Sequence, residues 1–334
     1  MKSNKLNLLD AGLAFVLAFI LAQFTSSIGV GITESIMQAC GKSASQIEAF
    51  FDTAVGYLLQ SIYMNIAFVL VFVWYIRRVN KNEVVLKPDQ STLKYVGKCV
   101  IIGIASLFLL SGILNYFQLL LDKLGATSSS LSYEINSPAK YIISLISLAV
   151  IPAVCEELIF RGVLVNALKS KGNIFAIIFS SLMFALFHFS LSQLIYPICF
   201  GLILSIVYLR TRNIFFPILL HFINNALSLS IQYFSGSSGG EFTHSSAMLI
   251  YAIVTLIAWI AIMIHLFKDF KLHCSHTSNS SNAEQSANDG AKAEQQVAER
   301  NQQSPNDSNE KVNNYVFYGC LTLMTIMYIV LVTI

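Results

Sequence analysis

Long apolar runs, repeated along almost the whole chain, are the feature that most restricts the fold of this sequence. A helix of roughly 20 residues crosses a hydrocarbon core about 30 Å thick, and only helices and closed barrels satisfy their backbone groups there. The pattern predicts an all-α fold, a polytopic transmembrane helical bundle of about 8–9 spans in the cell membrane. The candidate spans are residues 8–32, 54–76, 97–121, 141–168, 173–190, 193–210, 214–233, 247–267 and 313–334.

The composition agrees with this interpretation. Hydrophobic residues make up 55% of the chain and charged residues only 12%, about half the share found in soluble domains. The net charge of +3 comes with no basic stripe interleaved with aromatic residues, which argues against a nucleic-acid partner. The six cysteines are scattered and show no C-x-x-C spacing, so neither a disulfide framework nor a zinc ribbon is predicted. The lipid bilayer is the predicted environment.

Positive charge is distributed unevenly between the two ends of the predicted spans. If the spans alternate in direction, 17 of the 21 Lys and Arg residues fall on one side of the membrane. The positive-inside rule then places the N-terminus in the cytoplasm. The first apolar run is longer than the core of a signal peptide and has no convincing cleavage site after it, so we interpret it as a retained anchor.

The runs divide the chain into five predicted parts. N-terminal transmembrane helices occupy residues 1–140, a core of closely spaced spans 141–233 and an additional transmembrane helix 234–267. Residues 268–312 are rich in Ser, Asn, Gln and Ala and cannot bury enough apolar surface to fold, which predicts a disordered cytoplasmic linker. A C-terminal transmembrane helix is predicted at 313–334.

Two adjacent carboxylates and an arginine interrupt the fourth run. Ionisable groups at membrane depth cost about 3 kcal/mol or more each and usually mark function. On a helix, Glu157 and Arg161 are i,i+4 neighbours and can pair; we assign them to holding the helix and orienting Glu156. Glu156 points about 100° away without that partner, and such a carboxylate can serve as a general base or a metal ligand. A helix end at the interface, with all three side chains reaching water, is the structural alternative.

Two histidines lie in other predicted spans of the same region. His188 follows the run around Phe184, and His221 shares a helix face with Asn225 at i,i+4 spacing. Each taken alone could be a core histidine or a polar pair for helix association. Together with the acidic motif they occupy three neighbouring spans, which favours one shared polar site over three independent structural features.

The three motifs, E-E-x-x-x-R, F-x-x-x-H and H-x-x-x-N in this order, resemble those of the CAAX protease and bacteriocin-processing family of intramembrane proteases, also called the Abi family. The resemblance covers roughly residues 141–232 and implies proteolysis within the membrane. It rests on Glu156, Glu157, Arg161, Phe184, His188, His221 and Asn225.

Two mechanisms stay open under this resemblance. In the first, Glu156 with His188 activates a water, while His221 and Asn225 donate hydrogen bonds to the oxyanion. In the second, Glu156, His188 and His221 hold a zinc ion that activates the water. Because H-E-x-x-H is absent from the sequence and an asparagine suits oxyanion binding better than zinc ligation, we favour the first mechanism. Zinc and no cofactor are both compatible with the residues.

The predicted function is an intramembrane endopeptidase that cleaves a peptide or membrane-protein substrate. A noncatalytic scaffold or bacteriocin-immunity protein on the same fold is one alternative. A proton-coupled transporter is another, but it predicts polar residues spread through more spans or duplicated halves. One tension also follows from simple alternation of the spans: His188 falls near the outer end of its span and His221 near the inner end of its own.

Overall fold

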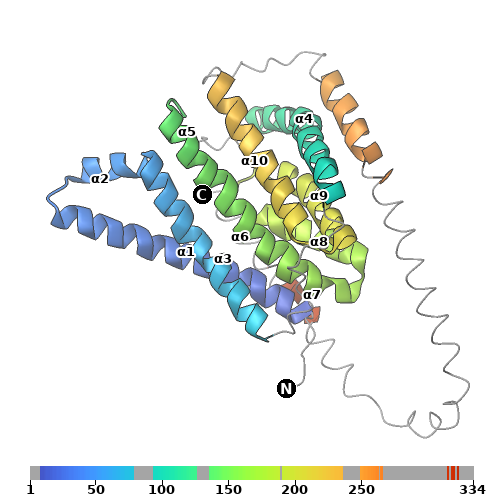
Figure 1. Cartoon of the computed structure of the whole chain (residues 1–334), viewed down its shortest axis with the longest axis horizontal. Helices are drawn as coiled ribbons and strands as arrows, with labels where there is room; N and C mark the ends of the chain where they lie inside the picture. The colour runs from blue at the N-terminus through green and yellow to red at the C-terminus, as the bar shows by residue number, and fades with distance from the viewer. Residues whose placement is uncertain are drawn as a thin grey trace, which may run out of the picture.

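The computed structural model of the chain is a bundle of helices (Figure 1). It describes residues 8–78, 93–125, 135–188, 190–235 and 249–262, together with residues 264–265, 314–315, 317–319 and 322. Within these ranges the regular structure is entirely helical. The all-α class predicted from the apolar runs is confirmed.

Among the described residues up to 235, thirteen helical segments are assigned, and another apolar helix follows at Leu249–Ile262. The segments are α1 (Leu8–Ala39), α2 (Ala44–Phe51), α3 (Ala54–Arg78), α4 (Leu93–Lys123), α5 (Pro138–Ser144), η2 (Leu145–Val150), α6 (Ile151–Ile159), η3 (Phe160–Val165), α7 (Asn166–Leu168), η4 (Lys169–Lys171), α8 (Asn173–Leu186), α9 (Ile195–Thr211) and α10 (Phe215–Ser235).

The segments from α5 to η4 form one rod of 34 residues, Pro138–Lys171, through the middle of the bundle. Two stretches of this rod, η2 and η3, are wound as π-helix. The nine residues of α6 lie between them in ordinary α geometry. Single-turn π segments inside α-helices often accompany functional sites, and here they flank the segment that carries the acidic motif.

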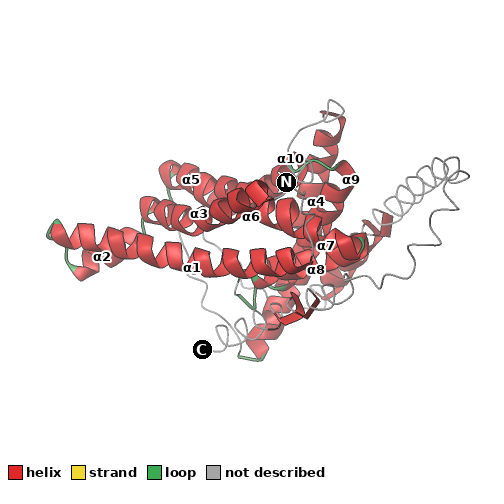
Figure 2. Cartoon of the chain, turned by 90° about the horizontal axis from the view of Figure 1, so that it is seen from below, coloured by secondary structure: helices red, strands yellow, loops and turns green. Residues whose placement is uncertain are grey.

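Helices α1 and α3 pack along each other and, with α2 between them, form an arm at one side of the bundle (Figure 2). The contact depends on Gly29 of α1, because a Cβ there would lie 2.3 Å from the Tyr63 ring of α3. The Tyr63 hydroxyl completes the contact by a 2.8 Å hydrogen bond with Thr33.

Small residues also bring α8 and α9 into close contact. A Cβ on Gly201 would lie 3.0 Å from Cβ of Ser181, and the hydroxyls of Ser180 and Ser205 share a 3.0 Å hydrogen bond. Small residues on facing surfaces commonly allow membrane helices to approach one another closely. The tight α8–α9 pair brings the carbonyl of Gly201 beside the central rod.

An aromatic cluster ties the arm, the rod and the end of α8 together. The ring of Phe187, just after α8, lies 4.9 Å from Phe68 of α3 and 6.0 Å from Phe160 of η3, measured between centroids. Phe19 of α1 meets the same ring at 6.1 Å. This packing fixes where α8 ends, and therefore where the next residue, His188, is placed.

In the part of the chain that the structure describes, five helices are long and apolar enough to cross a membrane, and three more apolar helices are shorter. The predicted runs at 173–190 and 193–210 correspond to the shorter helices α8 and α9, of 14 and 17 residues. The membrane fold is confirmed, whereas the predicted number of spans and the cytoplasmic N-terminus stay predictions. The predicted linker 268–312 and most of 313–334 lie outside the described residues.

The α1–α3 contact makes a testable prediction about packing. Gly29→Val should lower the free energy of unfolding by about 1–3 kcal/mol, because the new side chain must displace the Tyr63 ring. Gly31→Val is the matched control in the same helix, since no atom lies within 4 Å of a Cβ there. Thermal unfolding of both variants in one detergent measures the difference, and equal melting temperatures would contradict the assigned contact.

Candidate active site

The two glutamates of α6 are both buried but have different neighbours. Glu157 is fully buried and Glu156 is 9% exposed. Consecutive residues on a helix point about 100° apart, so one carboxylate faces the interior of the bundle while the other faces a different side of the rod. Their surroundings define two different chemical roles.

Glu157 and Arg161 form a fully buried ion pair. Nη1 of Arg161 donates to Oε1 of Glu157 at 2.7 Å, and neither side chain is exposed. Nη2 of the same guanidinium donates to the carbonyl oxygen of Gly201 at 3.2 Å. The i,i+4 pairing predicted from the sequence is confirmed, and it links the rod to α9.

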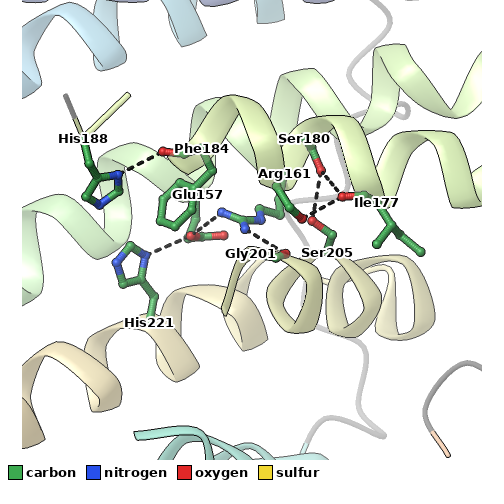
Figure 3. Close-up of polar contacts among 10 residues, drawn as sticks. Glu157, Arg161, Ile177, Ser180, Phe184, His188, Gly201, Ser205 and His221 are labelled. Atoms are coloured by element: carbon green, nitrogen blue, oxygen red, sulfur yellow. Dashed lines mark hydrogen bonds and ion pairs between the residues drawn. The ribbon is translucent and has the colours of Figure 1, made fainter. Parts of the chain in front are cut away.

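His221 of α10 contacts the same carboxylate (Figure 3). Its Nδ1 lies 2.9 Å from Oε1 of Glu157, and the histidine is 4% exposed. The carboxylate accepts from Nδ1–H, so the ring is held with Nε2 facing away from Glu157. Sequence reasoning paired Glu157 with Arg161 alone and missed this third member.

His188 lies in the turn after α8, with Nδ1 2.9 Å from the carbonyl oxygen of Phe184. A carbonyl oxygen can only accept, so Nδ1 carries the proton and Nε2 is the free nitrogen of the neutral ring. His188 and His221 are thus both held through Nδ1 by an oxygen acceptor. Each has Nε2 left for other chemistry.

The ring of Phe184 brings the two histidines and the arginine to one place. Its centroid lies 5.0 Å from the His188 ring and 5.7 Å from the His221 ring. The guanidinium carbon of Arg161 lies 4.8 Å from the same centroid, a cation–π contact. Phe184 belonged to the predicted motif, but its position between these groups could not be predicted from spacing.

The shared ring also resolves the difference in depth expected for the two histidines. Helix α8 has 14 residues, about 21 Å at 1.5 Å per residue, whereas the hydrocarbon core is about 30 Å thick. A helix of this length is too short to cross the core, so its position in the chain does not require His188 to be at the outer surface. The assumption that this run crosses the whole membrane was the source of the tension.

Oε2 of Glu156 is buried, and no hydrogen bond in the described structure reaches it. Oε2 of Glu157 is also without a hydrogen bond, but Oε1 of that carboxylate is bonded by Arg161 and His221. Buried polar atoms almost always have a partner, and an exception calls for an explanation such as a bound water or a catalytic role. Glu156 therefore offers a strong acceptor to a molecule that enters the site.

Asn225 lies one turn beyond His221 on α10, and its Nδ2 donates to the carbonyl oxygen of Leu148 at 3.2 Å. A side-chain amide nitrogen carries two hydrogens, so a second donor remains. Asn225 is thereby anchored to the rod on the N-terminal side of the two glutamates, with an N–H available for another acceptor.

The predicted zinc site of Glu156, His188 and His221 has support from only part of the geometry. Both histidines have the second-sphere acceptor that metal-bound imidazoles require. Nevertheless, no group of three or more His, Cys, Asp and Glu side chains in the described part of the chain is placed to hold a metal. The zinc alternative therefore stays a prediction.

Comparison with known proteins supports the interpretation of this region. Residues 138–227 match the family model described as type II CAAX prenyl endopeptidase Rce1-like. The central region of this chain is therefore similar to the CAAX protease family. The family predicted from the motif residues is therefore confirmed, and all six predicted site residues lie within this domain or at its C-terminal helix.

A Bacillus subtilis protein carrying the name "Putative membrane peptidase YdiL" is 24% identical over 221 residues, which are 65% of this chain and 87% of that protein. No solved structure matches the chain. With the apolar helices, these comparisons support a membrane peptidase of the CAAX protease family.

The buried ion pair of this domain makes a prediction about stability. Arg161→Met should lower the free energy of unfolding by about 3–5 kcal/mol, because Glu157 is left without its cationic partner in an apolar interior. Adding Glu157→Gln should recover most of that loss, since glutamine is neutral and still accepts from His221. Arg77→Met, an exposed arginine at the end of α3, is the control. If the losses of the two single variants simply add in the double variant, the pair is not coupled.

Proposed function

We propose that this chain is an intramembrane endopeptidase in which Glu156 and His188 activate a water, and His221 and Asn225 stabilise the oxyanion. The observation that supports it most directly is the meeting of three helices: Glu157 of the rod bonds His221 of α10, and both histidines contact Phe184 of α8. Polar groups from separate helices converge there within an apolar bundle, which is typical of a reaction site in a membrane protein.

The first step uses the free acceptors. A water donates one hydrogen bond to the unpartnered oxygen of Glu156 and another to Nε2 of His188. Glu156 takes the proton as the water oxygen forms a bond to the scissile carbonyl carbon, and the carbonyl π electrons move onto its oxygen. General-base catalysis of this kind contributes about 10²- to 10⁴-fold.

The second step uses the donors of α10. Nδ2 of Asn225 retains one N–H beyond its bond to Leu148. For Nε2 of His221 to donate as well, the ring must be imidazolium, and Glu157 carries the compensating negative charge at Nδ1. When the tetrahedral species collapses, the C–N bond breaks and the proton held by Glu156 passes to the leaving nitrogen. The products are a carboxyl group and an amine.

Glu157 and Arg161 act as positioning residues in this scheme. The arginine fixes Glu157, and Glu157 fixes His221, so the pair sets the direction of the second histidine as well as the turn that carries Glu156. The substrate is a peptide bond in a membrane-inserted or membrane-bound chain, because the site residues are held between apolar helices.

The base assignment is tested by Glu156→Gln, which keeps the shape of the side chain and removes the proton acceptor. Native termini of membrane proteins, compared by mass spectrometry in cells with equal expression, should lose specific cleavage products in this variant. Glu48→Gln, the same change on the exposed helix α2, should leave them unchanged. Identical termini in wild type and Glu156→Gln, with a phenotype retained by the variant, would favour a noncatalytic scaffold.

The oxyanion assignment makes a separate prediction. Asn225→Ala should lower kcat by about 10²- to 10³-fold with KM nearly unchanged, because the donor acts mainly in the transition state. The measurement uses the purified chain and a peptide spanning a terminus that wild type produces and Glu156→Gln does not. A rise in KM at constant kcat would instead make Asn225 a residue for substrate binding.

A further inference from the structure

A proline lies inside the central rod, at the junction between η2 and α6. Pro152 occupies the first turn of α6 and directly follows Ile151, whose N–H donates to the carbonyl oxygen of Ile146 in the i→i−5 register of a π-helix. Proline has no N–H. Residue 152 therefore donates neither to the carbonyl four residues earlier nor to the one five residues earlier.

Those two carbonyls belong to Leu148 and Ser147, and each accepts a hydrogen bond from a neighbouring helix. Nδ2 of Asn225 on α10 donates to Leu148 at 3.2 Å, and Oγ of Ser61 on α3 donates to Ser147 at 2.6 Å. Within a membrane a carbonyl without a donor is costly, and side chains of adjacent helices commonly serve those that a proline leaves. A residue with an N–H at position 152 would serve one of these two carbonyls, whereas Pro152 serves neither. The other carbonyl lies where the π geometry of η2 changes to the α geometry of α6.

The bond to Leu148 also fixes which way the Asn225 amide faces. Oδ1 of Asn225 lies 3.4 Å from Nδ2 of Asn224, and the hydroxyl of Tyr196 donates to Oδ1 of Asn224. If the Asn225 amide were turned over, its oxygen would face the Leu148 carbonyl, and two acceptors would oppose each other. The network holds the nitrogen end of the amide toward the rod.

Leu148, Pro152 and Glu156 are spaced four residues apart, so they follow one face of the rod. Helix carbonyls point toward the C-terminus, and the oxygen of Leu148 is thus directed toward position 152. Glu156 is the next residue of this row, one helical turn of about 5.4 Å beyond Pro152.

We propose that Pro152 is a positioning residue for catalysis: by withholding an N–H from Leu148, it reserves that carbonyl for Asn225 and sets the oxyanion donor one turn from the base. This inference rests on the proposed role of Asn225. It differs from a purely structural role, in which the proline only bends the rod and any loss of activity is independent of Asn225.

Pro152→Ala separates these roles, because alanine supplies the N–H and is well tolerated in a helix. With the full chain in detergent and the peptide defined above, kcat should fall by about 10- to 100-fold at nearly constant KM, as expected for a displaced catalytic group. Pro217→Ala, the same change in the first turn of α10, where a helix needs no N–H donor, should keep the wild-type kcat.

Three further variants decide the outcome. In the Asn225→Ala background, Pro152→Ala should cause no additional loss of kcat, whereas independent losses that multiply would overturn the proposal. Residue 152 replaced by lactic acid, which has an ester oxygen instead of N–H and no ring, should keep most of the activity that Pro152→Ala loses. Ser61→Ala removes the hydrogen bond to the Ser147 carbonyl. This change should lower kcat far less than Asn225→Ala does.

Two failures can be told apart. If Asn225→Ala loses activity but Pro152→Ala matches Pro217→Ala, the inference about Pro152 is wrong and the proposed function stands. If Asn225→Ala itself keeps the wild-type kcat, the oxyanion role fails, and the positioning role of Pro152 fails with it. Thermal unfolding of each variant shows whether it is folded, which for Pro152→Ala is expected since it restores a helix hydrogen bond.

Discussion

The buried contact between Arg161 and Glu157 is the interaction on which the rest of the site depends. A charge in the interior of a membrane bundle persists only with a partner. Each member of this pair also bonds a second helix: the guanidinium donates to Gly201 of α9, and the carboxylate bonds His221 of α10. The ion pair therefore does more than offset its own desolvation. It sets the spacing and rotation of the helices that carry the remaining polar groups, so the position of His221 is a consequence of electrostatics as well as of apolar packing.

At both π segments of the central rod, side chains donate hydrogen bonds to backbone carbonyls. Beside η2, Ser61 and Asn225 serve the carbonyls of Ser147 and Leu148. Within and after η3, Asn166 donates to the carbonyl of Gly162 at 2.9 Å and to the hydroxyl of Tyr208 at 2.6 Å. Such compensation is what an apolar environment demands of any departure from α geometry. The nine residues of α6 are consequently held at both ends, which gives the two glutamates a defined rotation about the rod.

Local spacing in the sequence was sufficient for part of this result. Apolar run lengths predict the helical membrane fold, and the separation of Glu157 and Arg161 predicts their pairing, because both depend on one helix alone. The bond between His221 and Glu157 joins residues 64 positions apart, and it depends on how α10 rotates against the rod. The π segments and the early end of α8 were also beyond prediction, because both arise from tertiary packing: the Phe187 cluster stops α8 two residues before His188. Residues with no motif of their own, such as Ser61 and Leu148, become meaningful only through these contacts.

Hydrolysis of a peptide bond consumes water, which the hydrocarbon interior of a membrane does not contain. The short length of α8 therefore bears on how water reaches the site. The helix stops at Leu186, and the turn that follows carries the hydroxyls of Ser190 and Ser192, which bond each other at 2.8 Å before α9 begins. Non-helical backbone at this depth is tolerated only where protein buries it or water reaches it. Helix α8 is roughly 9 Å shorter than the membrane core is thick, and the turn that follows it carries groups that water can wet. In this fold, helix length sets how close the aqueous phase comes to His188.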